Sequence, residues 1–149
     1  MTGEFAIAVH AIVYLNRHPG MFNSMALAQN VCTNPARIRK VMSKLKRAQL
    51  VDAKEGAVGG YRFLRDPKQT SLLEIFEAVG QPMVGVSWRS GDPDIGCMVA
   101  SGMAGVMDAI YREMDACCRK RLAEITIHDV DRLLSEKIAH DGKLPACYE

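Results

Sequence analysis

The sequence predicts a mainly α-helical protein that carries one small β-hairpin. Apolar residues recur at helical spacing in several segments, and capping or helix-breaking residues bound most of these segments. One glycine-rich stretch, residues 55–60, separates two short runs whose composition is typical of strands. With 149 residues, of which 48% are hydrophobic, the chain is long enough to bury a core without disulfides or metals.

The first two helices are separated by a helix-breaking segment. The run from Phe5 to Leu15 repeats apolar residues every three or four positions, which predicts a buried helix, and the His-Pro-Gly sequence at residues 18–20 ends it. Ser24 is a good N-cap residue, and the apolar residues between Leu27 and Val31 predict a second helix after it.

A three-residue turn of Cys32, Thr33 and Asn34 joins the second helix to a third. Asn34 is suited to cap this third helix, and Pro35 fits its first position, where the missing N–H costs nothing. Two helices that are joined so closely must cross steeply, as in a helix-turn-helix.

The third helix is strongly basic on one side. Between Asn34 and Arg47 there are six basic residues and no acidic one, whereas a merely solvated surface normally mixes signs to gain pairs one turn apart. We therefore predict that this face lies along duplex DNA. The residues expected to face the core are Ile38, Val41, Met42 and Leu45. Those expected nearest base edges are Ala36, Arg37, Arg39 and Ser43, and those expected near phosphates are Lys40, Lys44, Lys46 and Arg47, with Ser24, Thr33, Asn34 and Pro35 beside them.

The segment after the third helix predicts a hairpin, or wing. Leu50 to Lys54 and Tyr61 to Leu64 have the composition of strands, and the glycines between them permit positive φ and a close approach of backbone amides to DNA. The alternative is a hairpin whose glycines only satisfy turn geometry. The position directly after a basic helix, with Arg62 and Arg65 nearby, favours contact with DNA. The wing residues expected to touch DNA are Gly59, Gly60, Tyr61 and Arg62.

The second half of the chain predicts three more helices, one of them long. Ser71 is the expected cap of a helix that ends near Val79, and residues 80–96, which are rich in glycine and proline, predict a long loop. Thr126 and Asp129 resemble a capping box that opens a last helix.

The long helix, expected from Cys97 to Ala123, is apolar along one seam and therefore requires a partner helix. The seam residues are Val99, Met103, Val106, Ile110, Met114 and Cys117. The predicted organisation is a winged helix-turn-helix DNA-binding domain over residues 1–79, a sensor loop over residues 80–96, and a dimerisation helix with a C-terminal helix over residues 97–149.

Charge is distributed unevenly between the two halves. Residues 1–70 hold eleven Lys or Arg and four Asp or Glu, whereas residues 71–149 hold eight and thirteen. This asymmetry indicates that the basic N-terminal half binds a polyanion and that the acidic C-terminal half has another role. Glu4 and His10 do not fit an export signal, and no apolar run reaches the length of a membrane span, so we expect a cytoplasmic protein whose five cysteines are not structural disulfides.

Five runs of residues together carry a resemblance to a known family. They are Ser24-Met25-Ala26-Leu27-Ala28, Asn34-Pro35-Ala36-Arg37-Ile38, residues 45–51, Gly59-Gly60-Tyr61 and residues 71–79. In these runs the chain resembles the Rrf2 family of bacterial winged-helix transcription regulators, which includes IscR, NsrR and CymR. The resemblance covers nearly the whole chain and is specific between about residues 5 and 80.

The resemblance implies a homodimer with two winged helix-turn-helix heads and a long C-terminal helix that crosses its mate. It also implies that DNA contacts come from the recognition helix, here Asn34 to Arg47, and from the wing, here Gly59 to Arg62. We expect a repressor that binds a near-palindromic operator on double-stranded DNA.

The cysteines depart from the pattern of many members, which hold an iron–sulfur cluster by three closely spaced cysteines ahead of the dimer helix. Here only Cys97 lies in that region, and Cys117 and Cys118 follow about five helical turns later. Four ligands are the norm for such clusters, so we expect no cluster, no metal and no other cofactor.

Cys97 and Cys32 are instead the candidates for thiol-based redox sensing. Cys97 falls near the start of a long helix, where the helix dipole stabilises a thiolate, and Cys32 lies in the turn of the DNA-reading motif. A disulfide between subunits is one form of this switch; Cys147 is a weaker candidate, and Cys117 and Cys118 are expected at the dimer seam. Free cysteines that only fill apolar space are the alternative.

Other means of control remain open from the sequence alone. Trp88 and its loop are candidates for a small-molecule pocket, and the acidic C-terminal half is a candidate for docking a metabolic enzyme. An enzyme is not expected, because residues 56–60 match no phosphate-binding or dinucleotide-binding motif. The four histidines, His10, His18, His128 and His140, have no metal-binding spacing.

Overall fold

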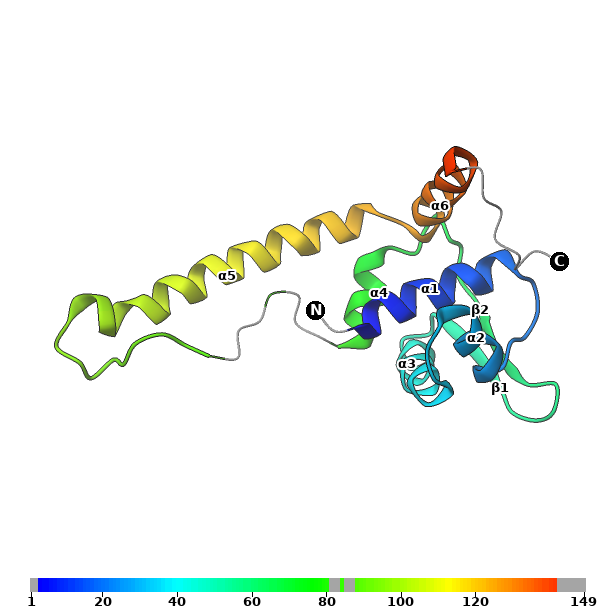
Figure 1. Ribbon diagram of the computed structural model, residues 1–149, viewed down its shortest axis with the longest axis horizontal. Helices are drawn as coiled ribbons and strands as arrows, with labels where there is room; N and C mark the ends of the chain where they lie inside the picture. Colours follow the sequence, from blue (N-terminus) through cyan, green and yellow to red (C-terminus); the bar gives the residue numbers. More distant parts are fainter. Residues whose placement is uncertain (1–2, 81–83, 85–87, 142–149) are drawn as a thin grey trace.

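The computed structural model in Figure 1 describes residues 3–80, 84 and 88–141. Its elements are α1 (Gly3–Arg17), α2 (Ser24–Val31), α3 (Pro35–Arg47), β1 (Val51–Lys54), β2 (Gly60–Phe63), α4 (Leu72–Val79), α5 (Met98–Glu124) and α6 (Ile127–Asp141). The predicted fold class is confirmed, since a mainly helical chain carries a single antiparallel hairpin of β1 and β2.

Helices α1 to α4 and the hairpin form a head around one hydrophobic core. Helix α1 runs through its centre and contacts α2, α3, α4 and β2. The predicted core face of α3 is confirmed, because Ile38, Val41, Met42 and Leu45 are all buried. Burial of each such side chain contributes about 1.5 to 3 kcal/mol of stability.

Side-chain caps begin several of the helices, as the sequence predicts. The Asn34 side chain accepts the N–H of Arg37 at 2.9 Å at the start of α3. A reciprocal capping box of Ser71 and Glu74 opens α4, and the Thr126–Asp129 pair opens α6 in the same way.

The predicted N-cap of α2 is wrong by one residue. Asn23, not Ser24, is extended and accepts the N–H groups of Met25 and Ala26 at 3.1 and 2.9 Å. Asn23 Oδ1 accepts both hydrogen bonds, and Ser24 is therefore the first residue of the helix.

Helix α5 leaves the head and extends along the long axis of the molecule (Figure 1). It begins and ends one residue later than predicted, and none of its residues is buried in the single chain. Among the described residues, no helix combines the length and the apolarity that a membrane crossing requires.

Helix α6 returns to the head and does not extend with α5. Ile127 is fully buried in the head core, and the Leu72 N–H donates to Ile125 O at 2.8 Å just before α6. Arg17 of α1 forms an ion pair with Asp131 of α6. Among the described elements, α6 therefore packs on the head, whereas α5 extends away from it.

The wing is attached to the rest of the head through Phe22. Phe22 exchanges two backbone hydrogen bonds with Tyr61, at 3.0 and 2.8 Å, beside the β2 edge. Gly60 lies against this contact with φ of +152°, and a Cβ there would come within 2.5 Å of the Phe22 backbone. A Cβ on Gly59 would lie 2.2 Å from Lys54 O. Packing within the fold thus requires both glycines.

We expect Gly60→Ala to destabilise the head by about 3 kcal/mol or more, because the positive φ and the collision with Phe22 add together. Gly56→Ala is the matched control, since Gly56 also has a positive φ, +106°, but open space around it, and should cost about 1 kcal/mol. Urea unfolding measures both losses. Equal losses would contradict the role given to the Phe22 contact.

Candidate nucleic-acid interface

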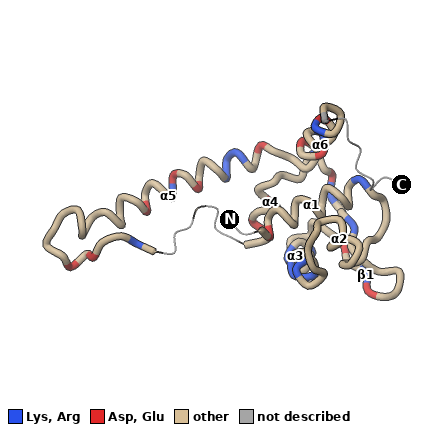
Figure 2. The backbone as a smooth tube through the Cα atoms, viewed as in Figure 1, with Lys and Arg blue, Asp and Glu red and all other residues tan. Residues whose placement is uncertain are grey.

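The outward side of α3 is the most basic surface of the head. Lysine and arginine gather on this helix in Figure 2. Because the apolar side of α3 is fully buried, the polar side is fixed outward. The exposed residues on it are Ala36, Arg37, Arg39, Lys40, Ser43, Lys46 and Arg47.

Helix α3 is connected to the start of α2 by one of its arginines. Arg39 Nη1 donates to Ser24 Oγ at 3.2 Å. Two residues that the sequence placed at the interface therefore lie together, on neighbouring elements. Thr33 is half-buried in the turn between the helices and Asn34 is exposed at the cap.

A hollow of about 410 Å³ lies between α3 and the wing. Ser43 and Lys46 line it from α3, and Asn23 and Ser24 line it from the start of α2. Gly59, Gly60 and Tyr61 line it from the wing. The structure thus brings predicted contacts from the start of α2, from α3 and from the wing to one hollow.

Lys44 lies differently from the prediction. Its Nζ donates to Glu4 Oε2 at 2.6 Å and to Val79 O at 2.8 Å, and only 23% of its side chain is exposed. Lys40 Nζ lies 2.6 Å from Glu4 Oε1. Hydrogen bonds from Lys40 and Lys44 lower the pKa of the Glu4 carboxyl, so it stays ionised at neutral pH.

The expectation that no acid opposes the basic helix is therefore wrong for two of its six cations. Spacing within α3 could not show this, because Glu4 belongs to α1, about 40 residues earlier in the chain. Within the described residues, Arg37, Arg39, Lys46 and Arg47 have no acidic partner. These four carry the unpaired charge of the surface.

The wing carries an exposed ion pair between its two strands, and its tip exposes both acidic and apolar side chains. Arg62 Nη2 lies 3.0 Å from Asp52 Oδ2 on the opposing strand, and both side chains are exposed. An exposed pair of this kind contributes about 0 to 1 kcal/mol, so it does not prevent Arg62 from turning to a phosphate. The tip itself exposes Glu55 and Val58.

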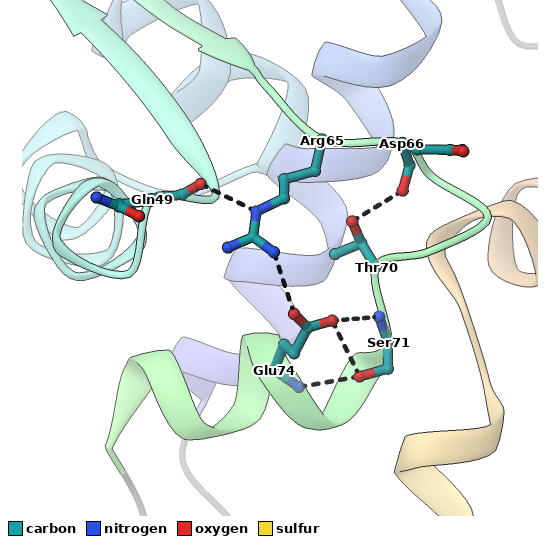
Figure 3. Close-up of polar contacts among 6 residues, drawn as sticks. All are labelled: Gln49, Arg65, Asp66, Thr70, Ser71 and Glu74. Carbon is teal, nitrogen blue, oxygen red and sulfur yellow. Dashed lines mark hydrogen bonds and ion pairs between the residues drawn. The ribbon is translucent and has the colours of Figure 1, made fainter.

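Arg65 lies at the base of the wing and points toward Gln49 and Glu74 (Figure 3). Its Nε donates to Gln49 O at 3.3 Å, and its Nη1 lies 3.4 Å from Glu74 Oε1. Nearby, the buried Thr70 hydroxyl donates to Asp66 O at 2.9 Å. These bonds join the end of α3, the end of the hairpin and the start of α4, and no motif in the sequence indicates them.

The two candidate redox cysteines are exposed but lie on distant elements. Cys32 ends α2 with φ of +57°, and Cys97 is the N-cap residue of α5. The backbone N–H groups of Ala100 and Val99 lower the pKa of the Cys97 thiol. The start of α5 and helix α2 lie toward opposite ends of the long axis in Figure 1. Cys147 lies outside the described residues.

The predicted sensor loop is described only in part, since residues 81–83 and 85–87 lie outside the described residues. Trp88 is 75% exposed. A hollow of about 530 Å³ beside α5 is lined by Val84 and by polar residues that include Tyr111, Arg112 and Asp115, but not by Trp88. A second hollow, of about 360 Å³, lies between the described part of the loop and the start of α5, and Trp88 does not line it either.

Together, a capped helix-turn-helix, a glycine wing and an outlying helix define a winged-helix DNA-binding protein. Residues 1–132 match the family described as Rrf2, iron-dependent transcriptional regulator. The chain belongs to the Rrf2 family of transcriptional regulators, as the sequence runs indicated.

Relatives cover almost the same length. YwnA of Bacillus subtilis strain 168, provisionally named an HTH-type transcriptional regulator, is 26% identical over 130 residues, which are 87% of this chain and 96% of YwnA. A solved structure from Lactobacillus plantarum, provisionally described as a transcriptional regulator, has a TM-score of 0.81 at 22% identity and covers 96% of this chain and 100% of its own. CymR of B. subtilis has a TM-score of 0.65 at 16% identity, with coverages of 89% and 96%.

Proposed function

We propose that this regulator binds a near-palindromic operator as a homodimer and represses transcription, with α3 in the major groove and the wing beside it. The observation that carries the proposal is the set of unpaired cations on the exposed side of α3, one of which, Lys46, lines a hollow that the wing also lines. Arg37, Arg39 and Ser43 are the candidates for base contacts. Lys46 and Arg47 are the candidates for phosphate contacts.

We expect Arg39→Ala to weaken operator binding by about 1 to 3 kcal/mol and to relax one position of the site, because a bidentate arginine contact to guanine is lost. Selection from random duplexes by the wild-type protein supplies the operator, and fluorescence anisotropy measures the affinities. Arg121→Ala on α5 is the control, since Arg121 is exposed far from the interface and pairs only locally with Glu124.

Two outcomes would count against this assignment. A wild-type protein that enriches no sequence would contradict the proposed function. An Arg39→Ala loss that is equal for all sequences would show that Arg39 meets only the backbone.

The solvent-exposed apolar seam of α5 supports the proposal of a dimer. Five of the six predicted seam residues are apolar side chains that remain 38% to 58% exposed, from Val99 to Met114, and Cys117 is exposed as well. A stripe of this length on a helix about 40 Å long is costly to leave in water. A second copy of α5 offers a matching apolar surface.

We expect the double change Val106→Asp and Ile110→Asp to convert the dimer to a monomer, because two carboxylates would be buried at the seam. Operator affinity should then fall at least about tenfold, since one head holds only one half-site. Ser101→Asp, which adds a charge on the opposite side of α5, should leave the dimer intact. Sedimentation velocity measures the assembly, and a monomeric wild-type protein would contradict the proposal.

We further propose that Cys97 senses oxidants. Its exposure and lowered pKa favour a thiolate, which attacks a peroxide so that an S–O bond forms, the O–O bond breaks and hydroxide leaves. The sulfenic acid then condenses with a second thiol to a disulfide and releases water. If that thiol is Cys32, it must come from another subunit, because the end of α2 and the start of α5 lie toward opposite ends of one chain (Figure 1).

An iron–sulfur cluster does not fit the cysteines described in this chain. Cys97 is separated from Cys117 by about 30 Å of continuous helix, so the two cannot approach one iron within a subunit. Among the described residues, no group of three His, Cys, Asp or Glu side chains could hold a metal. We therefore propose a cluster-free sensor. CymR of Staphylococcus aureus, a structural relative, has been solved in an oxidized form.

We expect peroxide or diamide to lower operator affinity of the wild-type protein and to produce a covalent dimer on non-reducing gels. Cys97→Ser should abolish both effects, because it removes the reactive thiolate. Cys118→Ser is the matched control, since Cys118 is also exposed. A Cys97→Ser protein that still responds like wild type would contradict the proposal.

A further inference from the structure

The carboxylate of Glu4 in α1 forms ion pairs with two lysines of the recognition helix α3. Each oxygen of Glu4 receives one lysine of α3, Lys40 on Oε1 and Lys44 on Oε2, both at 2.6 Å. The two lysines are not equivalent, since 65% of the Lys40 side chain is exposed against 23% of Lys44. Glu4 itself is 13% exposed, so the junction is largely covered.

Lys44 also reaches the end of α4. Its Nζ donates to Val79 O, the last carbonyl of that helix, at 2.8 Å. The carboxyl end of a helix carries partial negative charge, so an ammonium group at this position is doubly favoured. Three elements, α1, α3 and α4, therefore meet at one side chain.

The position of Lys44 around α3 separates it from the DNA-facing cations. Lys46 follows two residues later, and two residues correspond to about 200° around a helix, so the two lysines point to opposite sides. Lys46 lines the hollow with the wing, whereas Lys44 faces α1 and α4. An ammonium group has three donors, and Lys44 would lose two well-placed acceptors if it turned to a phosphate.

We propose that Lys44 is a positioning residue, which sets the orientation of α3 in the head through Glu4 and Val79 and makes no contact with DNA. This inference rests on the proposed function. It predicts that Lys44 affects operator recognition through the angle of α3, and that Lys46 acts through its charge on the phosphate backbone.

The experiment compares Lys44→Met with Lys46→Met, which remove one positive charge each from the same helix. Binding is measured between about 50 and 200 mM KCl, both to the selected operator and to a mixed-sequence duplex of equal length. For Lys46→Met the slope of log K against log salt should fall by about 0.9, with both duplexes weakened alike. For Lys44→Met the slope should stay at the wild-type value.

Lys44→Met should nevertheless bind the operator at least about fivefold more weakly, while its affinity for the mixed-sequence duplex changes little, because base contacts need the correct helix angle and phosphate attraction does not. Lys44→Arg, which keeps the charge and the donors, should restore the ratio of the two affinities. Thermal unfolding of each variant confirms that the head is folded. Lys44→Gln gives the same slope measurement should Lys44→Met fail to fold.

The results separate the two proposals. A slope that falls equally in Lys44→Met and Lys46→Met, or a Lys44→Met protein with wild-type operator affinity, would overturn the positioning role and leave the DNA-binding function standing. A wild-type protein that binds neither duplex would overturn the proposed function itself.

Discussion

The division of α3 into an apolar and a basic side is the constraint on which the interface depends. Ile38, Val41, Met42 and Leu45 are buried to within 1%, so the helix cannot rotate without exposing several core side chains at once. Each would cost about 1.5 to 3 kcal/mol. Hydrophobic packing on the opposite side therefore fixes the rotation of α3 about its own axis and keeps Arg39 and Lys46 outward. The role proposed for Lys44 concerns the angle of that axis within the head.

The sequence correctly predicted most of the features that depend on interactions between residues a few positions apart. The caps at Asn34, Ser71 and Thr126 and the core stripe of α3 follow from local hydrogen bonds and helical periodicity. Apart from the N-cap of α2, which was predicted one residue too late, the missed features join distant parts of the chain. Glu4 of α1 neutralises lysines of α3, and α6 packs on α1, although nothing in either segment alone indicates a partner.

Two different requirements can each explain the glycines at positions 59 and 60 of the wing. The sequence favoured Gly59 and Gly60 as points where DNA comes close to the backbone. The structure requires both for its own packing, against Lys54 O and Phe22. Because the internal requirement alone accounts for the pair, any contact with DNA at the wing must be argued from neighbours such as Arg62 and Lys54, whose side chains are free of that requirement.

Helix α4 is the element through which the outlying helix meets the recognition helix. On one side of α4, Arg119 Nη1 of α5 lies 3.2 Å from Glu77 Oε1, and the Arg119 guanidinium lies over the ring of Phe76. On the other side, Lys44 Nζ of α3 donates a hydrogen bond to Val79 O. Cys97 lies about 33 Å from Arg119 along α5. Chemistry at that thiol therefore cannot act on α3 by direct contact within one chain. It must move α5 as a body, or act on a second subunit, and in the first case α4 is the part of the head that α5 would displace.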